Sequence, residues 1–111
     1  ARVGPVLEHG LRAMVARHCA LAEYLAEQLS AAPGVEILND VVSNEVAIAC
    51  RDDAQTVAVL ERVQARGRVY PSHGLWRGRK IIRASVINHA TDRADIDLLA
   101  AEILDACRET A

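Results

Sequence analysis

The stretch from Trp76 to Ile103 constrains the fold most, because a strand pattern in it leads directly into a capped helix. A strand is predicted over Ile81–Asn88. A helix then follows with Thr91 as its N-cap, and Asp92 and Asp95 place negative charge in its first turn, where the helix dipole favours it. Its apolar residues return at helical spacing, namely Ile96, Leu99, Ala100, Ile103 and Leu104. The stretch therefore predicts a strand packed with an amphipathic helix.

The two faces of this strand differ, since side chains alternate along a strand. One face carries Ile82, Ala84 and Val86, and the other carries Ile81, Arg83, Ser85 and Ile87. An arginine between two isoleucines is unusual both in a core and on a solvent face. Two interpretations remain open. Either this face meets another protein surface and Arg83 binds an anion there, or the strand is an edge strand whose arginine extends to water.

A long amphipathic helix is predicted from Pro5 to about Ala32, ended by Pro33-Gly34. Its apolar side recurs at near-heptad spacing through Leu7, Leu11, Met14, His18, Ala22, Leu25 and Leu29. The flanking heptad positions are not consistently charged, which favours packing on a sheet over a coiled coil. His18 lies on the apolar side and is interpreted as a core or boundary residue, not as a ligand.

The middle of the chain alternates strands with one further helix. Strands are predicted over residues 35–38 and 45–50, and a strand is also predicted from Arg68 to Ser72, with His73-Gly74 in the turn that leads to the basic segment Trp76–Lys80. The second helix starts after Asp52, with Gln55 placed as in a capping box, and ends at Gly67. Its apolar stripe is expected to be Val57, Leu60 and Val63.

The order α-β-β-α-β-β-α predicts one α+β domain over residues 1–111, a small, mainly antiparallel sheet with helices on one face. The 111 residues are 51% hydrophobic, which supplies a core, although Phe is absent. A net charge of -2 argues against a nucleic-acid partner. There is no membrane-crossing run and no signal peptide. Cys19, Cys50 and Cys107 lack paired spacing and are interpreted as small buried residues in a reducing compartment.

Few side chains in the sequence suggest chemistry. Nucleotide-binding and metal-ligand motifs are absent, so no metal site is predicted. The carboxylate pairs Asp52-Asp53 and Asp95/Asp97 sit at helix starts, where capping explains them. His73 and His89 flank no positioned nucleophile. The basic cluster of Arg77, Arg79, Lys80 and Arg83 is interpreted as a solvated turn, except for Arg83.

The ordered residues also carry a family resemblance. Arg83 in an apolar strand, then Ser85-Val86-Ile87-Asn88, then Thr91, then Asp95-Ile96-Asp97, after Trp76-Arg77-Gly78-Arg79, resembles the C-terminal end of the group II pyridoxal-phosphate-dependent amino-acid decarboxylases. This fold type I family includes the glutamate, aromatic amino-acid, tyrosine and diaminobutyrate decarboxylases. The resemblance extends more loosely over the whole chain.

The resemblance implies the small C-terminal domain of a larger, cytoplasmic, homodimeric enzyme. Such a domain packs on the large cofactor-binding domain of the same chain and closes over the active site. In glutamate-decarboxylase-like members, the arginine that matches Arg83 contacts the carboxylate of the amino-acid substrate. Lys80, the only lysine, does not match the His-Lys motif that binds pyridoxal phosphate, so this chain alone is expected to bind no cofactor and to be inactive. His89 stands where relatives often differ, which leaves the substrate side chain open.

A second interpretation comes from another functional class. The chain is alternatively a stand-alone ferredoxin-like regulatory or dimerisation domain without catalysis, which uses its open sheet face to bind a second copy. A large domain with a His-Lys motif upstream would distinguish the decarboxylase interpretation from this one.

Overall fold

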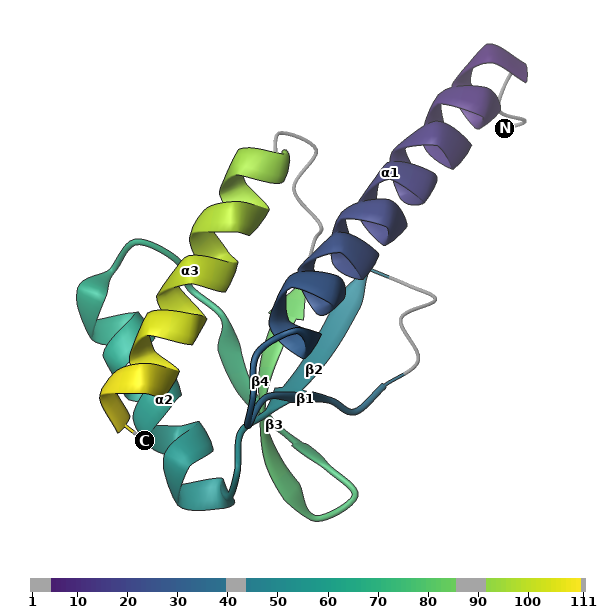
Figure 1. The fold of residues 1–111 in the computed structure, drawn as a ribbon. Coiled ribbons are helices and arrows are strands. Elements are labelled where there is room, and N and C mark those ends of the chain that lie inside the picture. Colours follow the sequence, from purple (N-terminus) through teal and green to yellow (C-terminus); the bar gives the residue numbers. More distant parts are fainter. Residues whose placement is uncertain (1–4, 40–43, 86–91, 111) are drawn as a thin grey trace.

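The computed structural model describes residues 5–39, 44–85 and 92–110, and side chains from residue 16 onward with the exception of residue 18. Its elements are α1 (Pro5–Ser30), β1 (Glu36–Ile37), β2 (Glu45–Ala49), α2 (Asp53–Arg66), β3 (Ser72–Trp76), β4 (Arg79–Ser85) and α3 (Arg93–Thr110) (Figure 1). The predicted order and the α+β class are confirmed. Val86, Ile87, Asn88, His89 and Thr91 lie outside the described residues.

The sheet has the strand order β1-β2-β4-β3, and every neighbouring pair is antiparallel. β4 is therefore an inner strand, paired with β2 from Ser85↔Glu45 to Ile82↔Ile48 and with β3 from Arg83↔Ser72 to Arg79↔Trp76. The interpretation of this strand as an edge strand is wrong.

The helices cover one face of the sheet (Figure 1). The predicted alternation is confirmed, because Ile82 and Ala84 face the helices while Ile81 lies on the opposite face. The fully buried side chains of the covered face come from both layers and include Val46, Ile48 and Ile82 of the sheet and Leu25, Leu29, Val59, Val63 and Ile103 of the helices. Burial of these branched side chains supplies most of the hydrophobic stabilisation.

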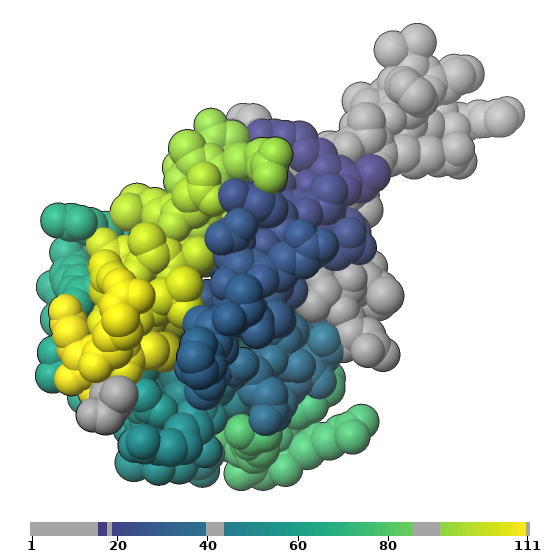
Figure 2. Space-filling model, in the orientation of Figure 1, coloured from purple at the N-terminus to yellow at the C-terminus, as the bar shows by residue number. Residues whose placement is uncertain are grey.

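Helices α1 and α3 lie side by side above the sheet, as Figure 2 shows for the outer surface. Tyr24 of α1 joins them, since its hydroxyl donates to Asp97 Oδ1 over 2.5 Å and the Arg93 guanidinium lies 4.3 Å from the centre of its ring. The predicted apolar stripe of α3 is confirmed, with Ile96 and Ile103 buried. Of the predicted stripe of α1, Ala22, Leu25 and Leu29 are buried, and the earlier members lie outside the described side chains.

The ends of α2 follow the sequence prediction closely. Asp52 Oδ1 accepts the backbone N–H of Gln55 over 2.8 Å, and Gly67 ends the helix at a φ of 70°, which glycine adopts without strain. The predicted apolar stripe is partly wrong, because Val57 is only half-buried and Thr56 and Val59 are buried beside Leu60 and Val63. The Thr56 hydroxyl is satisfied in the core, since it donates to Asp52 O and accepts from the N–H of Cys50.

The N-terminus of α3 differs by one residue from the prediction. Asp92 occupies the N-cap position, because its Oδ1 accepts the N–H of Asp95 over 3.1 Å and its carbonyl accepts the N–H of Ile96. Asp95 Oδ2 in turn accepts the N–H of Asp92 over 3.0 Å, which completes a reciprocal capping box.

The strand predicted over Arg68–Ser72 is wrong, since β3 begins only at Ser72 and contains His73 and Gly74. The turn is the two-residue step Arg77-Gly78, with φ values of 49° and 82°. Two successive positive φ values match the right-handed twist of a tight hairpin. This turn sets the register with β4, and that register decides which residues of segment 68–76 pair.

Candidate functional site

The face of the sheet opposite the helices carries a small apolar cluster, which we call the uncovered face. Ala47, Ala49 and Ile81 are buried there, and Leu38 and Trp76 pack against them. None of the described helices packs on this cluster, and Leu38 and Trp76 are the partly buried apolar side chains that contact it. Ala47 and Ala49 share this face because side chains alternate along β2.

Arg83 projects from the middle of β4 on this face. Its Nη2 donates to Glu45 Oε1 of β2 over 2.6 Å, and the Ser85 hydroxyl lies 3.3 Å from the same oxygen. The side chains of Arg83 and Glu45 are 49% and 47% exposed. The hydrogen bond from Arg83 lowers the pKa of Glu45 from its ordinary value. The predicted anion-binding arginine therefore already holds one carboxylate of its own chain.

Gly74 of β3 makes room for the arginine stem. A Cβ on Gly74 would lie 2.9 Å from Cδ and 3.2 Å from Cγ of Arg83, and 3.3 Å from Cγ1 of Ile81. Carbon atoms do not pack at the first of these distances, so any larger residue would displace Arg83 or the strand. Sequence reasoning placed Gly74 in a turn and missed this role, which depends on the pairing of β3 with β4.

A second ion pair crosses the uncovered face. Arg79 Nη1 of β4 lies 2.8 Å from Glu36 Oε2 of β1, although β2 separates these strands. Strands β1 and β4 are separated by two strand spacings, roughly 10 Å. The long side chains of Arg79 and Glu36 span this distance by passing over the short side chain of Ala49. The pair crosses at the Ala49 end of β2, because Glu36 is opposite Ala49 in the register. Arg79 is the first residue of β4 and not part of the turn, and its side chain remains 43% exposed beside Glu36.

The remaining candidate residues have structural roles or lie at the surface. Asp53 Oδ1 accepts the backbone N–H of Lys80 over 3.1 Å. This bond satisfies a donor near the start of β4, where β2 has already ended. Asp52 and Asp95 cap the starts of α2 and α3 as expected, whereas Asp97 caps no helix and accepts the Tyr24 hydroxyl. Arg77 is exposed at the turn. His73 lies on β3 opposite Ile82.

Lys80 and His73 line a groove of about 420 Å³ between α2 and the β3–β4 hairpin. The described lining does not fit pyridoxal phosphate, because it contains no arginine for the phosphate and presents the Glu61 carboxylate instead. We therefore derive no cofactor chemistry from this chain's own residues.

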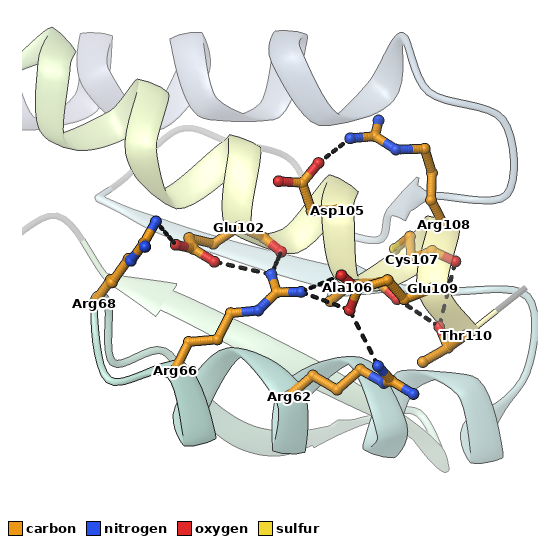
Figure 3. Close-up of polar contacts among 10 residues, drawn as sticks. All are labelled: Arg62, Arg66, Arg68, Glu102, Asp105, Ala106, Cys107, Arg108, Glu109 and Thr110. Atoms are coloured by element: carbon orange, nitrogen blue, oxygen red, sulfur yellow. Dashed lines mark hydrogen bonds and ion pairs between the residues drawn. The ribbon is translucent and has the colours of Figure 1, made fainter.

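An ion-pair network between α2 and α3 was missed by sequence reasoning (Figure 3). Glu102 is only 4% exposed, and its carboxylate accepts from Arg66 over 2.9 Å and from Arg68 over 3.3 Å. Arg66 also binds Glu109, which Arg62 contacts over 3.1 Å. Three arginines and two glutamates leave the network with one net positive charge, and their contacts fasten α2 to α3. The sequence signal is the spacing of like charges, four residues apart on α2 and seven apart on α3.

Two kinds of feature are absent from the described residues. None of the helices there is both long and apolar enough to cross a membrane. Within the same ranges, no three His, Cys, Asp or Glu side chains are grouped so that they would hold a metal ion.

The known proteins that this chain resembles are much longer than the chain itself. No protein-family model matches the chain. Over 105 residues, 87% of the chain, it is 33% identical to a probable glycine dehydrogenase (decarboxylating) subunit 1 of Azorhizobium caulinodans, of which it spans 23%.

Solved structures reproduce the whole architecture. Tryptophan decarboxylase of Catharanthus roseus, in complex with L-tryptophan, matches with a TM-score of 0.83 at 16% identity, over 91% of this chain and 22% of that one. The glutamate decarboxylase domain of diaminobutyrate-pyruvate transaminase and L-2,4-diaminobutyrate decarboxylase from Vibrio parahaemolyticus matches with a TM-score of 0.74 at 16% identity, over 86% of this chain and 22% of that one.

The chain thus spans less than a quarter of each of these proteins. At such low identity, the structural matches establish a shared fold and not a shared reaction. The resemblance to the C-terminal region of the group II decarboxylases is confirmed at the level of the fold.

Proposed function

We propose that this chain, which has the fold of the C-terminal region of pyridoxal-phosphate-dependent decarboxylases, is the small domain of such an enzyme. In this proposal Arg83 orients the carboxylate of an amino-acid substrate. The observation that carries the proposal is the position of Arg83 on an inner strand, on the face that the helices leave uncovered. An arginine held there can meet a ligand or a second domain without disturbing the core.

The proposed role follows from the chemistry of the guanidinium. Pyridoxal phosphate, when bound to the large domain, supplies the electron sink for decarboxylation. The bond to the departing carboxylate must be oriented relative to that sink, and a planar guanidinium binds a carboxylate through two parallel N–H bonds. Arg83 has five N–H donors, so it can bind a second carboxylate at another edge while Nη2 donates to Glu45. Glu45 then acts as a positioning residue that limits how Arg83 can turn.

The uncovered face is the surface that we propose packs on the large domain of the same chain and closes the active site. Its small apolar cluster has charged pairs on both sides, Arg83–Glu45 and Arg79–Glu36, a mixture that suits a contact between domains better than a free surface. The lengths of the relatives leave room for such a domain. A homodimeric, cytoplasmic parent belongs to the same proposal.

The direct test uses the full-length polypeptide that contains this chain. Purified with pyridoxal phosphate, it should release carbon dioxide from at least one amino acid in a panel that includes glutamate, aromatic amino acids and glycine. Glycine is included because the Azorhizobium caulinodans relative is named for a reaction on glycine. A natural polypeptide that begins at this chain, or a full-length protein that turns over none of them, would contradict the proposal.

The isolated chain provides a second test. It should fold but give no visible absorption band of bound pyridoxal phosphate, because the described residues around Lys80 do not form a phosphate site. A cofactor band at neutral pH would contradict the proposal.

A stand-alone ferredoxin-like regulatory or dimerisation domain is the second candidate. The run β2, α2, β3, β4 and α3 has the β-α-β-β-α succession that such domains also use, with β1 at the edge beside β2. A defined dimer of the natural polypeptide, formed through the uncovered face and without cofactor, would support this candidate instead.

A further inference from the structure

Two cysteines from distant parts of the chain meet beneath α3. Cys50 directly follows β2 and is 2% exposed, while Cys107 lies in the last turns of α3 and is partly exposed. Their sulfur atoms are 3.7 Å apart, although 57 positions separate them in sequence. Sequence reasoning interpreted all three cysteines as separate buried residues, and neither its spacing argument nor the resemblance paired these two.

The backbone around both sulfur atoms is held by the start of α2. The N–H of Cys50 donates to Thr56 Oγ1 over 3.0 Å, and Gln55 Nε2 lies 3.4 Å from the carbonyl oxygen of Cys107. Both cysteines thus share one rigid support, which keeps the sulfur atoms facing each other. Rotation about the Cα–Cβ bonds has to shorten the separation to about 2 Å for a disulfide, with only a small shift of α3.

Access to the pair comes from the side of Cys107. This residue lines a hollow of about 470 Å³ together with Arg51, Gln55 and Arg108. Apolar residues such as Val35 and Leu104 line most of this hollow, and a small uncharged oxidant such as hydrogen peroxide can enter it. Cys50 is almost fully buried and borders a second, smaller hollow of about 190 Å³ beside Arg79.

The contact between the two thiols also changes the pKa of each. A hydrogen bond between the sulfur atoms lowers the pKa of Cys50, and the same contact with burial raises the pKa of Cys107. The first deprotonation of the pair is thereby favoured and the second opposed. One thiolate beside one thiol is the arrangement that disulfide formation needs.

We propose that Cys50 and Cys107 are an oxidation site at which hydrogen peroxide closes an intramolecular disulfide between the end of β2 and α3. The thiolate attacks one oxygen of the peroxide, the O–O bond breaks, and the departing hydroxide takes a proton to leave as water. The resulting sulfenic acid is attacked by the partner sulfur, its S–O bond breaks, and a second water leaves. Two thiols are oxidised and one molecule of hydrogen peroxide is reduced, so atoms and electrons balance.

The disulfide fastens the C-terminal helix to the strand that carries Glu45 and the small residues of the uncovered face. Because it closes a long loop, it restricts the unfolded chain strongly and raises the melting temperature. This inference concerns the covered face and stands independently of the proposed decarboxylase function.

The experiment uses the chain with Cys19→Ser, treated with an excess of hydrogen peroxide. The substitution matters because trypsin leaves Cys19 and Cys50 on one peptide, residues 18–51, with Cys107 on residues 94–108. We expect a loss of two hydrogen atoms from the intact mass, a cross-linked pair of these peptides, a monomer on a non-reducing gel, and a melting temperature raised by about 10 °C. Dithiothreitol should reverse the mass loss, the peptide cross-link and the rise in melting temperature.

The matched control adds Cys107→Ser to the same chain, which leaves Cys50 without its partner. Peroxide should then produce neither the two-hydrogen loss nor the rise in melting temperature. In the Cys19→Ser chain that retains both cysteines, the proposal would be overturned if oxygen were added to Cys107 while Cys50 still reacted with iodoacetamide after unfolding. Chains joined in pairs would overturn it too, as would a disulfide that forms without raising the melting temperature.

Discussion

The two faces of the sheet bury their side chains by different means. On the covered face, Ile48 and Ile82 are fully buried by the apolar stripes of the helices. On the uncovered face, Ala47, Ala49 and Ile81 are also buried, but helices do not pack on them (Figure 1). There the shielding comes from Leu38, Trp76 and the long side chains of the ion pairs.

This difference separates the residues that determine the fold from those available for function. Branched side chains between two layers cannot move without leaving a cavity, so the covered face tolerates little change. On the uncovered face, the small residues Ala47 and Ala49 and the flexible charged side chains around Ile81 can relax after substitution. A ligand-binding arginine can therefore occupy the uncovered face at small cost to the stability of the fold.

The largest expected effect compares two neighbouring isoleucines of β4 on opposite faces. Ile82→Ala should lower the free energy of unfolding by about 4 kcal/mol, because its cavity is closed on all sides. Ile81→Ala should lower it by about 2 kcal/mol, because Arg83 and Trp76 can settle toward the space. Urea unfolding of both variants measures the difference. Equal losses would show that the uncovered face is as rigidly packed as the core.

The next effect compares ion pairs on the two sides of the sheet. Arg66→Ala should lower the free energy of unfolding by about 2 kcal/mol, because it removes a main partner of the buried Glu102 carboxylate. Arg83→Ala should lower it by less than about 1 kcal/mol, because Glu45 remains hydrated when its partner is lost. Thermal and urea unfolding check the order, and a reversal would contradict the account of the α2–α3 network.

Gly74→Ala tests the space beneath the Arg83 stem. The new methyl group should lower the free energy of unfolding by about 1–2 kcal/mol through overpacking. Adding Arg83→Ala should restore most of the loss, because the two closest atoms belong to that side chain. Unfolding of the double variant supplies the measurement, and strictly additive losses would mean that the strand, not Arg83, is displaced.

The smallest expected effect is the titration of Glu45. Since Arg83 lowers the pKa of Glu45, the pair stabilises the fold above the ordinary glutamate value of about 4.3. That contribution is lost as the pH falls through the lowered pKa, and it should stay under about 1 kcal/mol because both groups are half-exposed. Carboxyl NMR should show the Glu45 pKa rising in Arg83→Gln. An unchanged pKa would remove Arg83 as its cause.

Local chemistry allowed much of the fold to be predicted. Asp52 and Gly67 mark the ends of α2 through capping and a left-handed φ, which depend only on nearby backbone. The alternation of Ile81 and Ile82 predicted both faces of β4 correctly. The strand predicted over Arg68–Ser72 was wrong because Val69 and Tyr70 favour a strand locally, whereas pairing with β4 decides the outcome.

The candidate site was only partly predictable for a related reason. The unusual position of Arg83 among isoleucines was visible in the sequence, but its contact with Glu45 spans 38 positions and depends on the register of β2 with β4. The space at Gly74 depends on the register of β3 in the same way. Such contacts between strands follow from topology, which a local pattern does not encode.

The kinetic effect of Arg83→Lys in the full-length protein tests the central claim most directly, with Arg79→Lys as the matched control on the same strand and face. Losing one charge-assisted contact with the substrate carboxylate should lower kcat/KM by about one to two decades, with melting temperature and cofactor content nearly unchanged. Arg79→Lys, whose partner is Glu36, should leave kcat/KM near that of the unaltered protein. An unchanged kcat/KM in Arg83→Lys together with a large drop in melting temperature would contradict the account, because Arg83 would then be only a structural partner of Glu45.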